Sequence, residues 1–254
     1  MSPGAGQSTT FRAQPPELIE RPGLRLRLWR RWLQERGHNT ADLLEELIGQ
    51  ASWQQPILRL YGKSHPVPRL TSWMADPGCS YRYSGIDHAP VPFSGAAERL
   101  RQELNQGLGE PGFNSLLLNL YRHGHDRMGW HADDEPELDP AAPIASLSLG
   151  ASRDLRFRPR PGREAQPPFS LSLDDGDLLL MEAPSQRHWQ HGLPSRTRVQ
   201  RQRLNLTYRV IRPEAIRPQA STAMQSISTR APLGSAATST QARAGDTPSP
   251  NISA

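Results

Sequence analysis

Residues 203–211 constrain the fold of this chain more than any other segment, and they read RLNLTYRVI. Apolar and polar side chains alternate there, as in a β-strand with two different faces. The apolar positions are Leu204, Leu206 and Tyr208. The polar face carries Arg203 and Arg209, whose Cα atoms would lie about 20 Å apart along a strand. Burying two arginines is costly unless anionic groups meet them, so the segment predicts either a barrel strand that holds a short dicarboxylate or an outer strand with solvated arginines.

A histidine and a carboxylate stand two residues apart at His131 and Asp133, within the sequence NLYRHGHDRMGWHADD. In an extended chain both side chains point to the same face. His191 follows after several strand-like segments and supplies a second imidazole. Two imidazoles and one carboxylate on one face of a metal are the ligand set of non-haem Fe(II) oxygenases. Taken alone, His-x-Asp more often marks polar residues in a turn, so the metal hypothesis depends on the arginine strand.

Most of the chain reads as short strands joined by turns rich in proline, glycine and aspartate. The predicted strands are 57–61, 81–84, 115–122, 144–149, 155–158, 169–173, 177–182 and 203–211. Helices are predicted at 41–48, capped by Asn39 or Thr40 and ended by Gly49, and at 94–107. Residues 24–33 are ambiguous between an amphipathic element packed on the core and a basic segment for nucleic acid or a membrane surface. The pattern predicts a mainly β fold with flanking helices (α+β), either a closed barrel or a double sheet.

Composition indicates one domain with two tails. Residues 1–22 and 213–254 are rich in Pro, Gly, Ser and Thr, which predicts disordered tails around a domain at 23–212. The net charge of +5 favours a polyanionic partner, but only mildly, because Lys63 is the only lysine among 30 basic residues and arginine bias also follows from a GC-rich gene. Cys79 is the only cysteine, which fits a reducing compartment. Without a membrane-length apolar run or a signal-like start, we expect a soluble, intracellular monomer, cytoplasmic or, in a eukaryote, nuclear.

Together these motifs resemble the AlkB family of Fe(II)/2-oxoglutarate dioxygenases, and in particular the branch that repairs alkylated double-stranded DNA. The resemblance rests on Asn119-Leu120-Tyr121, His131-x-Asp133, His191 and Arg203-x-Asn205-x-Thr207-x-Arg209. Longer matching segments are LYGKSHPVPR, HADDEPEL and PIASLSLGASRDLRFR. The resemblance covers residues 56–212 and implies a double-stranded β-helix, a jelly-roll barrel with helices packed outside.

The resemblance also implies roles for residues in the barrel mouth. It assigns Fe(II) to His131, Asp133 and His191, and 2-oxoglutarate to Asn119, Tyr121, Arg203, Thr207 and Arg209. The implied activity consumes O2 and 2-oxoglutarate, hydroxylates an N-methyl group of 1-methyladenine or 3-methylcytosine in DNA, and releases succinate, CO2 and formaldehyde. Reaching such a methyl group inside a duplex requires the base to leave the stack.

Several segments could meet the nucleic acid, and each has a plainer interpretation. Tyr61, in the hairpin with Gly62 and Lys63, would wedge into the base stack where relatives carry phenylalanine, or would belong to an ordinary hairpin. Further candidates for substrate contact are Arg69, Tyr81, Arg82, Tyr83, Asp134, Arg196 and Arg198, with Arg156, Arg158, Arg160 and Arg163 as a second basic cluster. The tyrosines could instead be core aromatics, Asp134 could cap a turn, and the arginines could be solvated surface side chains.

Three other functions remain open from the sequence. The same chemistry could act on single-stranded DNA, RNA or a protein side chain, although such a substrate needs no wedge. A non-catalytic nucleic-acid-binding module on a decayed barrel is a second reading, which the intact ligand set disfavours. Zinc-dependent hydrolysis is a third, and it leaves Arg203 and Arg209 without a purpose.

Overall fold

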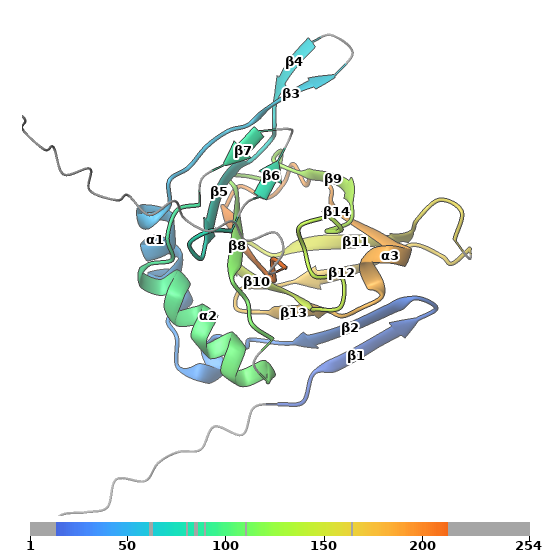
Figure 1. The fold of residues 1–254 in the computed structure, drawn as a ribbon, viewed down its shortest axis with the longest axis horizontal. Helices are drawn as coiled ribbons and strands as arrows, with labels where there is room; N and C mark the ends of the chain where they lie inside the picture. The colour runs from blue at the N-terminus through green and yellow to red at the C-terminus, as the bar shows by residue number, and fades with distance from the viewer. Residues whose placement is uncertain are drawn as a thin grey trace, which may run out of the picture. The chain divides into compact units, whose positions relative to one another are not determined.

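The computed structural model describes residues 14–60, 63–79, 81–83, 86–88, 90–109, 111–163 and 165–212, all within one compact unit. Two antiparallel sheets form a jelly-roll barrel, with helices on the outer face of the larger sheet (Figure 1). In spatial order the larger sheet contains β1 (Glu17–Arg21), β2 (Leu24–Trp29), β13 (Leu178–Met181), β10 (Ile144–Gly150), β15 (Arg203–Arg209), β8 (Ser115–Tyr121) and β5 (Leu70–Ala75). The smaller sheet contains β12 (Phe169–Leu173), β11 (Arg153–Pro159), β14 (Trp189–Leu193) and β9 (Met128–His131). The predicted fold class is confirmed.

Short elements complete the described chain. One hairpin joins β3 (Ile57–Leu60) to β4 (Lys63–Pro66) and projects from the barrel, and another joins β6 (Tyr81–Tyr83) to β7 (Ile86–His88) (Figure 1). The helices are η1 (Gln34–Arg36), α1 (Thr40–Gln50), α2 (Gly95–Leu108) and α3 (Ser185–His188). Within the described part of the chain, no helix has the length and apolarity that crossing a bilayer requires.

Two apolar clusters hold these layers together. On the outer side of the larger sheet, Leu204, Leu206 and Tyr208 of β15 are 0% exposed and belong to one cluster with Leu47 of α1 and Leu100 of α2. Between the sheets lies a second cluster, made of Leu24, Leu26, Leu28, Ile144, Phe157, Leu173, Leu179, Met181 and Trp189. Full burial of one leucine contributes about 1.5–3 kcal/mol, so the clusters dominate the stability of the barrel. The alternation predicted for β15 is therefore confirmed, with its apolar face under the helices.

The helices begin where the sequence indicates, but α1 ends later. Asn39 is the N-cap of α1, and its side chain accepts hydrogen bonds from the backbone N–H groups of Ala41 and Asp42. Gly49 does not end α1, which continues to Gln50. Glycine costs about 1 kcal/mol inside a helix, and the packing of Ile48 and nearby apolar residues against the core offsets that cost.

The N-terminal boundary drawn from the sequence is wrong for residues 17–21. Glu17–Arg21 form β1, paired along its whole length with β2, and β2 resolves the ambiguous segment 24–33 as a strand whose leucines enter the core. The turn is Pro22-Gly23, in which proline favours φ near −65° and Gly23 adopts φ +70°, as in a type II turn. Composition indicated a tail because residues 1–22 as a whole are rich in Pro, Gly, Ser and Thr, and this bias conceals a strand of only five residues at its end.

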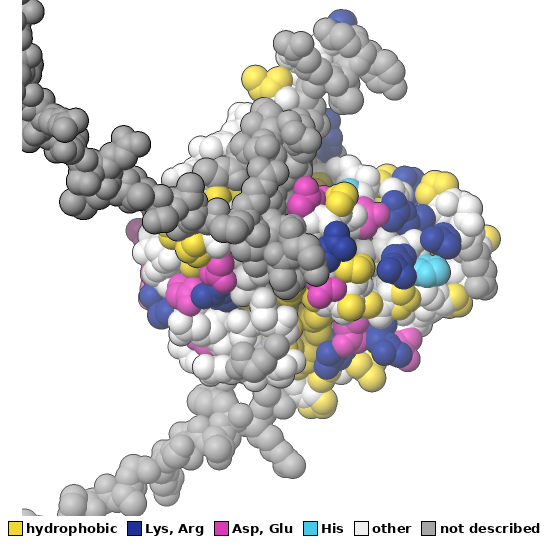
Figure 2. Space-filling model, in the orientation of Figure 1, with side chains coloured by type: hydrophobic (Ala, Val, Ile, Leu, Met, Phe, Trp, Pro, Cys, Tyr) yellow, Lys and Arg dark blue, Asp and Glu magenta, His cyan; other side chains and the backbone are white. Residues whose placement is uncertain are grey.

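Charge is distributed unevenly over the surface. Figure 2 shows basic side chains, which are arginines because the only lysine lies in β4, gathered over the side of the barrel where Figure 1 places β11 and α3. β11 pairs with β14, the strand of His191, and α3 leads directly into that strand, so a polyanion meeting this side would lie near His191.

Candidate metal and cosubstrate site

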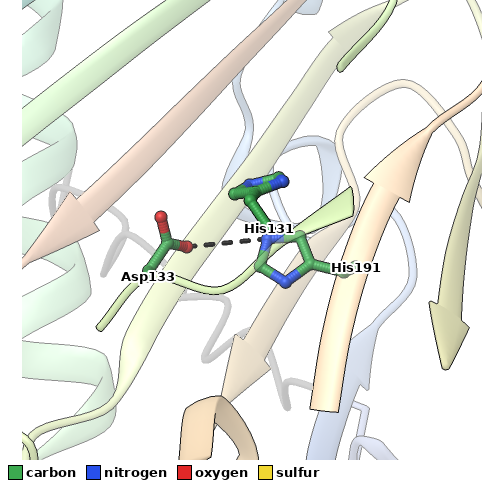
Figure 3. Close-up of side chains that lie close together, drawn as sticks. All are labelled: His131, Asp133 and His191. Atoms are coloured by element: carbon green, nitrogen blue, oxygen red, sulfur yellow. Dashed lines mark ion pairs between the residues drawn. The ribbon is translucent and has the colours of Figure 1, made fainter. Parts of the chain in front are cut away.

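Three candidate metal ligands converge from strands that neighbour each other in the smaller sheet. His131 ends β9 and pairs in register with His191 of β14, and Asp133 follows two residues after His131 (Figure 3). One ligand atom from each residue lies within 4.8 Å of the other two. The two imidazole rings have centroids 4.2 Å apart, and His191 Nε2 lies 3.6 Å from Asp133 Oδ2. Antiparallel pairing thus brings together residues that are 60 positions apart in sequence.

Burial of His191 and a hydrogen bond of His131 suit the two imidazoles to bind a metal. Burial, and then the neighbouring His131, lowers the pKa of His191 to about 3, so this imidazole is neutral at physiological pH. His131 Nδ1 lies 2.9 Å from the carbonyl oxygen of Gly129, which can only accept a hydrogen bond. Nδ1 of His131 therefore carries the proton, and its Nε2 is free for a metal.

Asp133 is held as a carboxylate despite its burial. Burial opposes ionisation, but the charge and hydrogen bond of Arg209 outweigh it and keep the pKa of Asp133 below its usual range. An Arg209 guanidinium nitrogen pairs with Asp133 Oδ1, and the backbone N–H of Asp133 donates to Gln186 Oε1 at 3.0 Å. Sequence reasoning missed Gln186, since nothing local links this residue of α3 to a position 53 residues earlier.

One cavity is lined by all the residues predicted to bind iron and 2-oxoglutarate. The lining residues include Asn119, Tyr121, His131, Asp133, His191, Arg203, Thr207 and Arg209. β15 and β8 supply the polar wall, because Arg203 pairs with Tyr121 and Asn205 pairs with Asn119 in antiparallel register. Apolar side chains complete the lining, namely Met128, Leu155, Leu173, Met181 and Leu193. A polar strand face is thus enclosed by apolar walls that limit access of water.

Arg203 is a buried cation without a carboxylate partner among the described residues. Its side chain is 2% exposed and donates to Ser148 Oγ at 2.8 Å, while its Nε has no hydrogen-bond partner within the described structure. Burial lowers the pKa of Arg203 to about 10, which leaves it charged at neutral pH. An uncompensated buried charge is unfavourable, so this end of the cavity is suited to an anion.

The residues lining this cavity fit both Fe(II) and 2-oxoglutarate, the two groups that the predicted reaction requires. The triad offers two imidazole nitrogens and a carboxylate, as a divalent iron needs. A dicarboxylate would meet Arg203 at one end of the cavity and Arg209 at the other, and Arg209 also contacts the carboxylate of the triad. Arg69 lies behind this wall rather than on the surface. It is 5% exposed, and its Nε donates to Asn119 Oδ1 at 2.8 Å.

The residues predicted to meet the nucleic acid are described only in part. Lys63 is exposed at the start of β4, whereas Tyr61, Gly62 and the side chains of Tyr81, Arg82 and Tyr83 lie outside the described residues. Asp134 is exposed next to the triad and pairs with Arg160 at 2.5 Å, so it does not simply cap a turn. On the loop after β14, Arg198 is exposed and Arg196 pairs with Asp154 at 2.6 Å.

Comparison with known proteins agrees with this geometry. The family model described as 2OG-Fe(II) oxygenase superfamily matches residues 25–209. DNA oxidative demethylase ALKBH2 of Mus musculus is 42% identical over 161 residues, which cover 61% of this chain and 67% of the mouse protein. Alpha-ketoglutarate-dependent dioxygenase alkB homolog 3 of Homo sapiens is 36% identical over 179 residues, 68% of this chain and 62% of the human protein. ALKBH2 of Homo sapiens is 41% identical over 159 residues, 61% of this chain and 60% of that protein.

The fold has a solved counterpart as well. "The structure of OsALKBH1" superposes with a TM-score of 0.53 at 17% identity and covers 76% of this chain and all of that one, which supports the fold alone. The chain spans about three fifths to two thirds of the length of the curated relatives named above. On these grounds the resemblance to AlkB proteins is confirmed, and the chain belongs to the 2OG-Fe(II) oxygenase superfamily, whose members use Fe(II), 2-oxoglutarate and O2.

Proposed function

We propose that this chain is an Fe(II)- and 2-oxoglutarate-dependent demethylase of N-alkylated bases in DNA, acting on 1-methyladenine and 3-methylcytosine. The main support is that one cavity contains both the His131–Asp133–His191 triad and the buried Arg203, which has no carboxylate partner among the described residues. Relatives named DNA oxidative demethylase support the choice of DNA as substrate.

In this proposal the triad holds Fe(II). When bound, the iron would supply the oxidative chemistry in which O2 and 2-oxoglutarate are consumed, the N-methyl group is hydroxylated, and succinate, CO2 and formaldehyde leave. The chain positions the ligands. Gly129 fixes the tautomer of His131, and Gln186 fixes the backbone of Asp133, so each lone pair is set before the metal arrives.

Polar residues on β8 and β15 would bind the cosubstrate. Arg203 would pair with one carboxylate and Arg209 with the other, because guanidinium groups stay charged and bind carboxylates in bidentate fashion. Asn119, Tyr121 and Thr207 would add hydrogen bonds to the same molecule, and Arg69 would orient the amide of Asn119. Enclosure by apolar side chains strengthens each of these interactions by lowering the local dielectric constant.

Residues around the cavity mouth would handle the nucleic acid. The projecting hairpin with Tyr61, Gly62 and Lys63 would enter the duplex and displace the base, which favours double-stranded DNA over single strands or RNA. Tyr81, Arg82 and Tyr83 would contact the flipped base, and Asp134, held by Arg160, would meet its edge. Arg196 and Arg198 would contact phosphates without reading sequence. The monomeric state, the intracellular location and the disordered tails beyond the barrel remain predictions.

Release of formaldehyde and succinate from a duplex carrying one 1-methyladenine tests the proposal. Turnover should require both Fe(II) and 2-oxoglutarate, with omission of each as a control. Succinate release without demethylation would overturn the substrate assignment and redirect the search to RNA or protein. Absence of both products from the iron-loaded protein would overturn the enzymatic assignment and favour a binding module.

A further inference from the structure

The loop after β14 is docked on the connection between β8 and β9. We call residues 194–199 the basic loop, since they carry Arg196 and Arg198. Gly124 bonds to this loop in both directions: its N–H donates to the carbonyl of Val199 and its carbonyl accepts from the N–H of Arg196, each at 2.7 Å. A Cβ atom at Gly124 would lie 1.7 Å from the carbonyl oxygen of Arg196, so only glycine permits this approach.

One buried side chain hydrogen-bonds both to the basic loop and to the connection between β8 and β9. Arg153, the first residue of β11, is 3% exposed, and its terminal nitrogen donates to the carbonyl oxygens of Asp126 at 2.9 Å and Pro194 at 2.7 Å. Its guanidinium carbon lies 5.9 Å from the ring centroid of Tyr121, a residue of the cosubstrate cavity. The same arginine thus contacts the wall of the cavity and the base of the basic loop.

The next residue of β11 holds the loop from the opposite face of the strand. Asp154 accepts hydrogen bonds from Arg196 Nε at 3.0 Å and from its terminal nitrogen at 2.6 Å. Successive side chains of a strand point to opposite faces, so Arg153 fixes the loop backbone and Asp154 fixes a loop side chain. The basic loop is therefore held on both faces of β11 by side chains of the protein itself.

We propose that Arg153 is a positioning residue for nucleic-acid binding, which acts by holding the basic loop docked against the cavity wall. This inference rests on the proposed function, in which Arg196 and Arg198 contact phosphates. A loop that is ordered beforehand loses less conformational entropy on binding, so the anchor raises affinity without touching the nucleic acid. Releasing it should weaken nucleic-acid binding through the loop, while the triad and the arginines of β15 stay in place.

The anchor is tested first in the free protein, without metal or nucleic acid. Limited digestion with trypsin, read by mass spectrometry, reports cleavage after Arg198, because a protease needs the loop to open locally. Arg153→Met and Gly124→Ala should each raise this cleavage rate about tenfold or more, with Arg153→Lys in between. Arg99→Met is the matched control, since Arg99 is exposed on α2 and pairs, among the residues that the structure describes, with Glu46 of α1.

Cleavage at the rate of the unmodified chain in Arg153→Met and Gly124→Ala would overturn the anchor. If Arg153→Met does not fold, as judged by its thermal transition, the cleavage rates of Gly124→Ala and Arg153→Lys test the anchor instead, because neither substitution removes the buried charge. Raised loop cleavage in these two supports the anchor, and unchanged cleavage refutes it.

Binding of a methylated duplex, followed by fluorescence anisotropy, tests the role in recognition. Arg153→Met should bind about tenfold more weakly and show this loss in KM for duplex rather than in kcat, while Arg99→Met matches the unmodified protein. Raised cleavage with unchanged affinity would overturn the positioning role. Failure of the unmodified protein to bind any duplex would refute the proposed function instead, and the cleavage result would still decide the anchor.

Discussion

Replacing Arg203 by methionine should have opposite effects on stability and on cosubstrate binding. Methionine has a similar length and no charge, so it removes the cation while keeping most of the packing volume. The folded protein without ligands holds this cation in a buried place with no carboxylate partner among the described residues, and it should therefore tolerate the loss. Binding of 2-oxoglutarate should suffer, because one of its carboxylates would have no cation to meet.

The size of the stability effect follows from the pKa of Arg203. Burial lowers this pKa from 12.5 to about 10, and one pKa unit corresponds to about 1.36 kcal/mol, so the charge destabilises the folded state by roughly 3 kcal/mol. The penalty is complete at neutral pH, since the guanidinium is protonated in both states there, and it falls only as pH rises through about 10. Loss of the hydrogen bonds to Ser148 and Leu173 offsets about 1–3 kcal/mol of the gain. The net expectation is between no change and about 2 kcal/mol of added stability.

Urea unfolding at neutral pH measures both effects. Without ligands, Arg203→Met should be at least as stable as the unmodified chain. With Mn(II) and 2-oxoglutarate at about 100 times its Kd, the unmodified chain should gain about 2.7 kcal/mol and the variant should gain nothing from the cosubstrate. Arg201→Met is the matched control, because Arg201 is exposed two residues before Arg203. A ligand-free variant more than about 2 kcal/mol less stable would refute the buried-charge argument, and a full cosubstrate gain would remove Arg203 from the site.

Two further substitutions and one labelling experiment test other parts of the protein. Asp133→Ala should abolish turnover and metal binding, since it removes a metal ligand and the carboxylate that pairs with Arg209; activity near that of the unmodified chain would exclude Asp133 from the metal site. Tyr61→Ala should reduce activity on duplex far more than on single strands, and equal losses in the two assays would contradict the wedge. The Cys79 thiol is 3% exposed, and burial and then Asp76 raise its pKa, so it should react with a disulfide reagent only after unfolding; rapid labelling of the native protein would show that this region opens.

The alternation of β15 and the His131-x-Asp133 spacing could be predicted because each lies within one short stretch of sequence. β15 has a strict two-residue period, and β8 shares its face through direct pairing, so the polar wall follows from sequence once the barrel is assumed. The start of α1 could likewise be predicted from Asn39, because its side chain caps backbone N–H groups only two and three residues ahead. In each case the partners lie within one element or on its neighbour.

Elements with short or interrupted periods escaped prediction. β9 has four residues, one of them a glycine, and β14 contains Gly192, so neither carries enough apolar residues for a pattern, although they hold His131 and His191. The side chains that hydrogen-bond to the site and to the basic loop were not predicted for another reason. Gln186 meets Asp133, Arg69 meets Asn119 and Arg153 meets Pro194 across 41 to 53 residues, and only the folded barrel defines these distances.

The two faces of β15 explain how the barrel tolerates its own site. The buried charge of Arg203 costs roughly 3 kcal/mol before its hydrogen bonds offset part of it, whereas Leu204 and Leu206 on the opposite face, both 0% exposed, contribute about 1.5–3 kcal/mol each when fully buried. That burial exists only because α1 and α2 cover the outer side of the larger sheet. The helices do not line the cavity, but they stabilise the strand that does. Without their cover, the burial of Leu204 and Leu206 would not offset the cost of holding the Arg203 cation in place for an anionic cosubstrate.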